Sequence, residues 1–231
     1  MKLSRRRLRR RPPGALRGQR QLFIRRLLKW FRENGRTYPW RQTADPYRIF
    51  VAEFMLQRTG AQQVLPVYAE FVARYPTWKD AGGADEETLQ ILLRPLGRVQ
   101  RYRVFRKALL HVAEHGGRLS ASLRTLLRIP GVGPYTARAV LVFAHKRRLG
   151  LFDPNIYRVI GRVFGLASAK RRPHTDPTMW RAVDDLIPRG RSKEMNLALL
   201  DFAAAVCRIR KPLCPVCPLN DICDYYRRVG S

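Results

Sequence analysis

The feature that most constrains this chain is a group of cysteines on one short loop. All four cysteines lie within the seventeen-residue stretch CRIRKPLCPVCPLNDIC near the C-terminus, at Cys207, Cys214, Cys217 and Cys223, with six, two and five residues between them. Four sulfur ligands this close together predict that the loop wraps around one metal centre.

Three kinds of site use four cysteines. Disulfides are disfavoured, because the N-terminus lacks the apolar segment of a secretory signal and a reducing compartment is therefore expected. Structural zinc sites often pair two CxxC-like knuckles, whereas this loop has a single CxxC, at Cys214 and Cys217. A compact set of four thiolates suits an iron–sulfur cubane with a structural role. Spacing alone favours iron–sulfur and leaves zinc open, because both metals accept four thiolates.

The charge of the chain indicates a polyanionic partner. Its 231 residues include 46 Lys and Arg against 17 Asp and Glu, a net charge of +29. Nucleic acid is favoured over a membrane surface, because no apolar run reaches the roughly 18 residues of a membrane span. Residues 1–20 are rich in arginine, with proline and glycine between, and are predicted to form a disordered arm that adds salt-sensitive attraction to DNA. We expect a cytoplasmic or nucleoid location, or a nuclear or organellar one in a eukaryote.

Helical periodicity dominates from Gln21 onward, and no alternating strand pattern or repeat occurs, so the sequence predicts an all-α protein of about ten short helices. Asp45 followed by Pro46 is typical of an N-cap and first helical residue. The expected helices cover residues 21–34, 46–59, 61–75, 85–97, 99–117, 120–129, 134–147, 154–166, 176–187 and 193–207.

A glycine-rich turn joins two of the expected helices in LLRIPGVGPYTARAVLVF. Pro130 ends the first helix, Gly131 and Gly133 allow backbone geometry closed to other residues, and Pro134 fits the first turn of the next. Such a turn exposes backbone N–H groups that can bind a phosphate or a cation that does so. An ordinary turn between helices is the alternative.

The hairpin, the following LFDPNIYRVIGRVFG and the four-cysteine loop, in that order, resemble the helix-hairpin-helix DNA glycosylases with an iron–sulfur cluster, relatives of endonuclease III and of the adenine and thymine mismatch glycosylases. The resemblance runs from about Leu27 to Tyr226. It implies two helical lobes flanking a DNA-binding cleft: a six-helix lobe of residues 38–147, and a cluster lobe of residues 21–37 with 148–231. It also implies a [4Fe-4S] cluster on the four cysteines and, as partner of a monomer, double-stranded DNA with a mismatched or damaged base.

The resemblance assigns chemistry to three residues. Asp153, by itself a helix N-cap, matches the family Asp that stabilises the cationic sugar, although the family usually has a small residue or Thr where this chain has Pro154. Glu53 shares a helix face with apolar residues, so its pKa should rise, as suits an acid that protonates the leaving base. A helix-edge glutamate paired with an arginine is the alternative. Tyr135 occupies the position of the Lys that forms a Schiff base in strand-cutting members, so the chain is predicted to be monofunctional.

The resemblance also implies a DNA-binding set. Gln57 matches a residue that enters the gap left by the flipped base, and Arg58 lies beside it; a solvated helix residue is the alternative for Gln57. The predicted DNA-binding residues are Gln57, Arg58, Gly131, Val132, Gly133 and Thr136.

Two branches of the family compete for the substrate. The LQRT segment and the ending DFAAAVCRIRKPLC…CDYY favour the branch that removes thymine or uracil opposite guanine. Adenine glycosylases acting opposite guanine or 8-oxoguanine read LGYYARA where this chain reads LGRVQRY, and usually have a C-terminal domain beyond the position of Ser231. Adenine removal is the alternative substrate, and a non-catalytic DNA-binding protein of the same fold is the alternative of another class.

Overall fold

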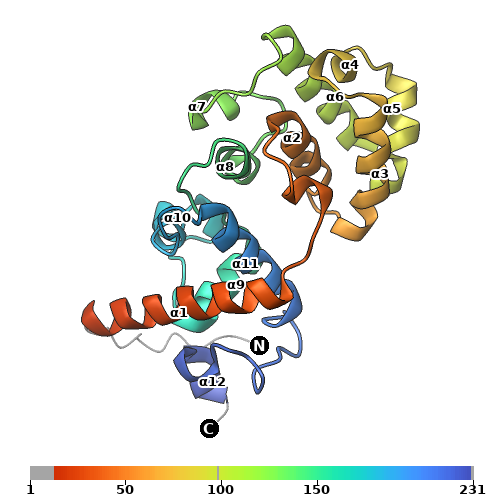
Figure 1. Ribbon diagram of the computed structural model, residues 1–231. Coiled ribbons are helices and arrows are strands. Elements are labelled where there is room, and N and C mark those ends of the chain that lie inside the picture. The colour runs from red at the N-terminus through yellow and green to blue at the C-terminus, as the bar shows by residue number, and fades with distance from the viewer. Residues whose placement is uncertain (1–12, 98, 230–231) are drawn as a thin grey trace. The chain divides into compact units, whose positions relative to one another are not determined.

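The computed structural model describes residues 13–97 and 99–229 (Figure 1). These residues form helices joined by turns and contain no β-strand, which confirms the predicted all-α fold. The helices are α1 (Pro13–Asn34), η1 (Pro39–Arg41), α2 (Pro46–Met55), α3 (Ala61–Arg74), α4 (Trp78–Gly82), α5 (Glu86–Leu93), η2 (Arg94–Leu96), α6 (Val99–Glu114), α7 (Leu123–Leu126), α8 (Pro134–Phe143), α9 (Pro154–Phe164), η3 (Pro173–Thr175), α10 (Pro177–Asp184), α11 (Ser192–Ala205), η4 (Asn220–Ile222) and α12 (Asp224–Val229).

The chain divides into two compact units. One unit is continuous, from Thr37 to Arg147, and is called here the hairpin unit because it contains the glycine-rich turn. The other, the cysteine unit, joins the chain up to Arg36 to the segment from Arg148 onward. The glycine-rich turn and the cysteine loop therefore belong to different units.

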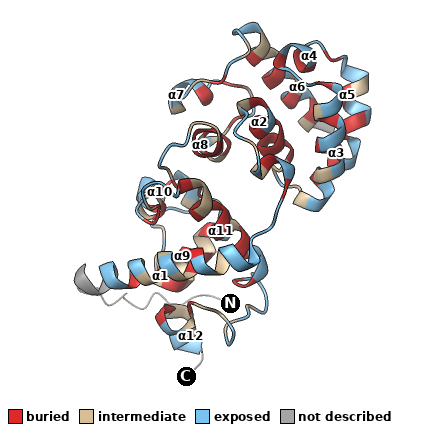
Figure 2. Cartoon of the chain, viewed as in Figure 1, coloured by how far each residue is buried: buried red, intermediate tan, exposed pale blue. Residues whose placement is uncertain are grey.

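Helix α2 is the central element of the hairpin unit and packs against α3 and α8. Its N-terminus is fixed as the sequence predicts: Pro46 is the first helical residue, and the Asp45 carboxylate accepts a hydrogen bond of 2.9 Å from the Tyr47 amide. All but two of its ten residues are buried (Figure 2). A helix buried on nearly every face can carry a polar side chain only at a cost in free energy, unless a partner or a function compensates.

Helix α11 has the same central place in the cysteine unit, where it packs against α1 and α9. Two of its polar side chains are almost fully buried, Asn196 and Asp201, and both have partners. Asn196 accepts a bond from the Leu151 amide and donates to the Leu149 and Ser192 carbonyls. The Asp201 carboxylate binds the guanidinium and the amide of Arg36, the last residue of the N-terminal segment of this unit.

The prediction of a disordered arm over residues 1–20 is wrong for its last part. Helix α1 begins at Pro13, and the side chain of Gln19 is buried in the cysteine unit, where it donates hydrogen bonds to the carbonyls of Val163 and Ile222. These tertiary bonds stabilise a segment whose arginines favour solvation. Residues 1–12, which complete the predicted arm, lie outside the described residues.

Candidate functional site

Glu53 lies in the middle of α2 with only 7% of its surface exposed. Burial raises the pKa of its carboxyl to about 7, and the positive charge of Arg41 only partly opposes this shift. The rise in pKa predicted from the apolar face is therefore present. At neutral pH a large fraction of Glu53 is protonated and can donate a proton.

No described residue forms a hydrogen bond or an ion pair with the Glu53 carboxyl, so pairing with Arg48 or Arg58, the alternative left open by the sequence, does not occur. Arg48 instead pairs with Asp45, with 3.6 Å between its Nε and the carboxylate, and Arg58 is exposed. A buried acid without a structural partner is a candidate functional group, because structural buried acids are normally paired.

The chain leaves α2 through a turn that contacts the glycine-rich hairpin. The side-chain amide of Gln57 donates hydrogen bonds of 3.3 Å to the Gly131 carbonyl and to the Thr136 hydroxyl. Arg58, next in the chain, has a left-handed backbone with φ of 60°. The structure thus brings together three of the predicted DNA-binding residues, Gln57, Gly131 and Thr136, and leaves Arg58 exposed beside them.

The two glycines of the hairpin have different roles. Gly131 has φ of +75°, and a Cβ there would lie 2.8 Å from the Phe54 ring and closer still to Val104, so the hairpin rests directly on α2 and α6. Gly133, the N-cap of α8, has φ of −92°, which any residue adopts, and a Cβ there would meet nothing within 4 Å. The expectation that both glycines are required by backbone geometry is therefore wrong for Gly133.

The remaining hairpin residues are partly engaged within the unit. The Val132 side chain is buried and its amide donates to the Ile129 carbonyl, at 3.1 Å, inside the turn. The Thr136 side chain is also buried, and Tyr135 is half-buried in the first turn of α8. Contacts of Val132 and Thr136 with DNA stay predictions.

Asp153 belongs to the cysteine unit and is the N-cap of α9. One carboxylate oxygen accepts a hydrogen bond of 2.7 Å from the Ile156 amide, and the other accepts one of 2.9 Å from the Asn155 side chain. The carboxylate is half-exposed, so it is held rigidly while it remains accessible. Glu53 and Asp153 lie in different units, and their action on one nucleotide stays a prediction.

A chain of hydrogen bonds connects Asp153 to the cysteine loop. Asn155, which donates to Asp153, accepts a bond of 2.9 Å from the guanidinium of Arg158. The same guanidinium donates to the carbonyls of Cys207, at 2.8 Å, and of Ala203, at 2.9 Å. Three consecutive hydrogen bonds therefore join the backbone of the loop at Cys207 to the Asp153 carboxylate.

None of the four cysteines forms a disulfide, and all four line one pocket between α9, α11 and α12. Burial is the main cause that raises the pKa of the Cys217 thiol to about 12 and the pKa values of the Cys214 and Cys223 thiols above their usual range. A bound metal cation would favour the thiolate forms and so offset this effect of burial.

Within 13–97 and 99–229, no three His, Cys, Asp or Glu side chains are arranged to hold a single metal ion. A cubane cluster places its four thiolates on different irons, so they surround a volume instead of converging on a point. Four thiols around one mostly apolar pocket fit that donor set. Arg162 lies beside them, with its guanidinium 3.4 Å from the Cys207 sulfur and bonded to the carbonyls of Arg208 and Ile209.

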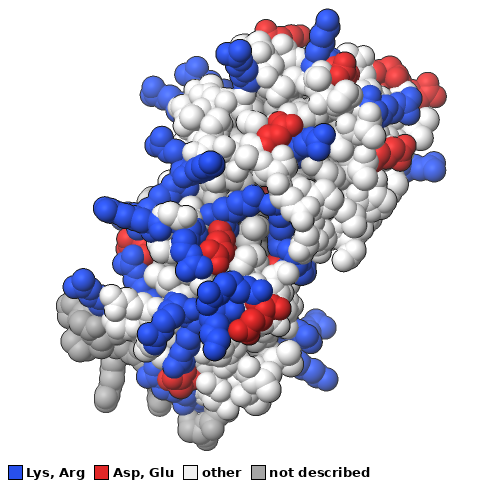
Figure 3. Space-filling view, viewed as in Figure 1, with Lys and Arg blue, Asp and Glu red and all other residues white. Residues whose placement is uncertain are grey.

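Lys and Arg side chains form several patches on the face of the molecule shown in Figure 3. Blue Lys and Arg side chains far outnumber red Asp and Glu on the face shown, in agreement with the net charge of +29. On the cysteine loop, Arg208, Arg210 and Lys211 are all exposed. No helix of the described chain is long and apolar enough to cross a bilayer.

A family model described as the helix-hairpin-helix motif matches residues 114–143. A thymine-DNA glycosylase of Aeropyrum pernix is 45% identical to this chain over 217 residues, which are 90% of this chain and 96% of that protein. The chain belongs to the helix-hairpin-helix DNA glycosylases. The resemblance predicted from the hairpin and the cysteine loop is thereby confirmed.

Other relatives of this glycosylase come from both substrate branches. An adenine DNA glycosylase of Mycobacterium tuberculosis is 34% identical over 90% of this chain and 69% of its own length. Among solved structures, a thermostable thymine-DNA glycosylase has a TM-score of 0.87 and 31% identity, and the match covers 93% of this chain and 99% of that one.

Sequence reasoning missed Asn155 and Arg158 in this glycosylase. A signal was available, since an Asp N-cap followed by Asn and Arg two and five residues later places three polar side chains near one helix end. The acceptors of Arg158 are backbone carbonyls of Ala203 and Cys207, however, and a sequence does not reveal which carbonyls a fold brings close.

The raised pKa of Glu53 predicts a pH-dependent stability. Between its usual pKa near 4.5 and about 7, the unfolded chain releases the proton and the folded glycosylase keeps it, so the free energy of unfolding falls as pH rises. A shift of this size removes about 3 kcal/mol, with no further loss well above pH 7. Glu53→Gln does not titrate, so its melting temperature should rise relative to wild type between pH 5 and pH 8.

Thermal melts across this range are the measurement, and the exposed glutamate variant Glu33→Gln is the control, which should follow the wild-type profile. Parallel profiles for Glu53→Gln and wild type would show that the carboxyl titrates normally.

Replacing each of the two hairpin glycines by alanine should have a different effect, on stability for Gly131 and on DNA binding for Gly133. Gly131→Ala should lower the free energy of unfolding by about 1–3 kcal/mol, because its φ is positive and its Cβ meets Phe54 and Val104. Gly133→Ala should change stability by less than about 0.5 kcal/mol but weaken DNA binding, since the methyl group stands where a phosphate approaches the turn. Denaturant melts and fluorescence-anisotropy titrations with duplex DNA measure the two effects. Unchanged DNA affinity in Gly133→Ala would contradict the phosphate contact.

Proposed function

We propose that the protein is a monofunctional DNA glycosylase of base excision repair that hydrolyses the bond between the sugar and a flipped thymine or uracil paired with guanine. The observation that carries the proposal is the buried, unpaired carboxyl of Glu53, in a chain that belongs to the helix-hairpin-helix DNA glycosylases. Without a function, an isolated acid on the central helix would only destabilise the hairpin unit.

Glu53 acts as the general acid. Breaking the sugar–base bond leaves negative charge on the base, and a proton delivered to the base stabilises that charge in the transition state. With a pKa of about 7, Glu53 is protonated often enough to supply the proton and acidic enough to release it. The rate of base release should therefore fall as pH rises through about 7.

Asp153 stabilises the positive charge that develops on the sugar and orients the attacking water. Its carboxylate is fixed by the Ile156 amide and by Asn155, so little reorganisation accompanies the reaction. Both groups require an extruded nucleotide, because the target bond is shielded while the base is stacked.

Tyr135 excludes the lyase reaction. A Schiff base requires an amine that attacks the sugar carbon, and a phenol does not provide one. Water is therefore the nucleophile, and the product is an abasic site in an unbroken strand. Tyr135, in the first turn of α8, contacts the target base or the sugar-side water.

Double-stranded DNA is held by the hairpin, the Gln57 turn and the basic surface. The N-terminus of α8 at Gly133 offers amides and space to a phosphate. Gln57 enters the gap left by the flipped base, Arg58 lies beside it, and Lys and Arg elsewhere add salt-dependent affinity. The protein works as a monomer at the chromosomal DNA, in the cytoplasm or nucleoid, or in a nucleus or organelle.

The cofactor proposed for the cysteine loop is a [4Fe-4S] cluster held by Cys207, Cys214, Cys217 and Cys223. It supplies a structural centre that orders residues 207–223. The protein's own contribution is the guanidinium of Arg162 beside the Cys207 sulfur, which offsets negative charge on the thiolates.

Thymine or uracil is preferred as substrate because the relative from Aeropyrum pernix, named a thymine-DNA glycosylase, matches 96% of its own length at 45% identity. Adenine opposite guanine or 8-oxoguanine is the second candidate, favoured by the 34% identity to the adenine enzyme of Mycobacterium tuberculosis.

The decisive experiment is single-turnover incubation of the protein with duplexes containing T·G, U·G, A·G or A·8-oxoguanine. We expect free thymine and uracil, no adenine, and strand breaks only after hot alkali. Glu53→Gln and Asp153→Asn should each slow release by about 10²–10⁴-fold, the usual contribution of an acid or an electrostatic group. The exposed controls Glu33→Gln and Asp185→Asn should retain the wild-type rate.

Each other outcome selects an alternative. Release of adenine alone supports the adenine reading, and no release from any duplex supports a non-catalytic DNA-binding protein. Strand breaks without alkali would contradict the monofunctional assignment.

The cluster proposal predicts about four irons per chain and a broad visible absorption from thiolate–iron charge transfer. Cys217→Ala should lose the iron and the colour and melt at lower temperature. Asn220→Ala, which changes a residue of the same pocket that carries no thiol, should keep the iron. A colourless protein that contains zinc would contradict the proposal.

A further inference from the structure

Arg101, on α6, has a side chain that gathers four acceptors from other segments of the hairpin unit. Its guanidinium donates to the Thr59 hydroxyl at 2.8 Å, the Met55 carbonyl at 3.2 Å, and the Phe54 and Leu96 carbonyls at 3.4 Å. Phe54 and Met55 precede Gln57 and Arg58 in the chain, and Thr59 follows them. One guanidinium therefore connects the end of α2 to the far side of the turn that follows it.

The planar guanidinium of Arg101 matches the arrangement of these oxygen acceptors. Phe54 and Met55 are the last two residues of α2, where the regular i to i+4 bonds of the helix end, and the Phe54 carbonyl also accepts a bond of 3.4 Å from the Gln57 amide. The guanidinium offers five N–H donors in a planar fork, so it can bind both carbonyls and a hydroxyl at once. The ammonium of a lysine is a single point and cannot span the same acceptors.

The turn itself is strained and is held on both sides. Arg58, at its centre, has φ of 60°, a conformation that costs a non-glycine residue of order 1 kcal/mol and that persists only if the surroundings impose it. On one side Gln57 is bonded to Gly131 and Thr136 of the hairpin. On the other side Thr59 is bonded to Arg101. Thr59 is also held within the turn, since its amide donates to the Leu56 carbonyl at 3.3 Å, and Arg101 adds the restraint that comes from another helix.

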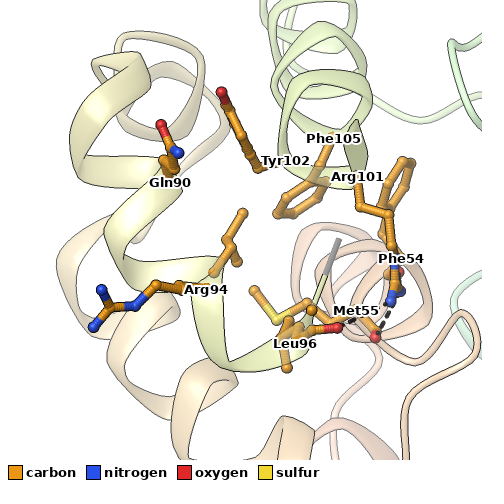
Figure 4. Close-up of a pocket in the computed structure, with 10 residues that line it drawn as sticks. Phe54, Met55, Gln90, Arg94, Leu96, Arg101, Tyr102 and Phe105 are labelled. Atoms are coloured by element: carbon orange, nitrogen blue, oxygen red, sulfur yellow. Dashed lines mark hydrogen bonds between the residues drawn. The ribbon is translucent and has the colours of Figure 1, made fainter. Parts of the chain in front are cut away.

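Hydrogen bonds, more than close packing, define the position of the Arg101 side chain. It borders a pocket of about 140 Å³ whose walls include Phe54, Leu96 and Phe105 (Figure 4). Figure 4 shows the guanidinium at the edge of this space, bonded toward the end of α2, with the aromatic rings beside it. Removing the side chain would therefore open a path for a small cation from solution.

We propose that Arg101 is a positioning residue that holds the turn from Gln57 to Thr59 in the shape in which it enters the DNA duplex. The inference rests on the proposed function, because it assigns to this turn the opening of the base pair. Arg101 does not touch the reacting atoms. Its loss leaves Glu53 and the glycine-rich hairpin in place but weakens extrusion of a paired base.

The test compares Arg101→Lys with Arg103→Lys, a matched control on the same helix whose arginine is exposed and pairs with Glu86 away from the turn. Excision of uracil is measured from a U·G duplex and from a duplex whose uracil lies in an unpaired bubble, where extrusion costs less. Arg101→Lys should lose about 10- to 100-fold on U·G, the effect of one or two charge-assisted bonds, and much less in the bubble. Arg103→Lys should match wild type on both.

A second readout separates positioning from folding. Fluorescence of 2-aminopurine beside the mismatch reports duplex opening without any cleavage, and Arg101→Lys should reduce it at unchanged melting temperature. For Arg101→Ala, methylguanidinium should restore part of the U·G rate through the space at the pocket, and methylammonium at equal concentration should not.

The outcomes distinguish this inference from the proposed function. Equal U·G rates for Arg101→Lys and Arg103→Lys, with normal wild-type excision, would overturn the role of Arg101 alone, as would equal losses on U·G and bubble substrates. If wild type released no base from any duplex, the proposed function would fail, and the 2-aminopurine signal would then decide whether Arg101 still controls opening.

Discussion

Burying a polar side chain on a central helix costs free energy, and the two units of this glycosylase differ in whether a hydrogen-bond partner offsets that cost. In the cysteine unit, α11 carries Asn196 and Asp201, and both are fully bonded, so they fix neighbouring segments. In the hairpin unit, α2 carries Glu53, which has no hydrogen-bond partner among the described residues, and desolvation raises its pKa to about 7. Buried groups of similar placement thus differ in whether the fold supplies a partner, and the partnered ones join neighbouring segments of the chain.

Several features of the fold could be predicted because their causes are local. The Asp45 cap, the Asp153 cap of α9 and the positive φ of Gly131 each follow from a few adjacent residues. Other features depend on distant segments. The helical start of α1 at Pro13 is stabilised by bonds from Gln19 to two carbonyls far along the chain, so the arginine-rich composition was misleading there.

The same distinction applies to the site. The rise in the pKa of Glu53 follows from the apolar face of its own helix, so pattern was sufficient. The supporting arginines were not predictable, because Arg101 and Arg158 bind backbone carbonyls, and every residue type has one. Both hairpin glycines were expected to adopt a backbone geometry closed to other residues, but of the two only Gly131 has a positive φ. Gly133 has an ordinary backbone and open space around it, so folding does not explain why a glycine stands there, and access for a ligand is the remaining explanation.

Each unit fixes its functional groups to a single helix. In the hairpin unit, Glu53 lies on α2, the Gln57 turn begins where α2 ends, and the hairpin rests on Phe54 of α2 through Gly131. In the cysteine unit, α9 carries Asp153 at its start, and Arg158 and Arg162 bind the cysteine loop one and two turns later. A chain of three hydrogen bonds therefore joins the loop at Cys207 to the Asp153 carboxylate through Arg158 and Asn155, so one helix ties both groups into the same packed unit.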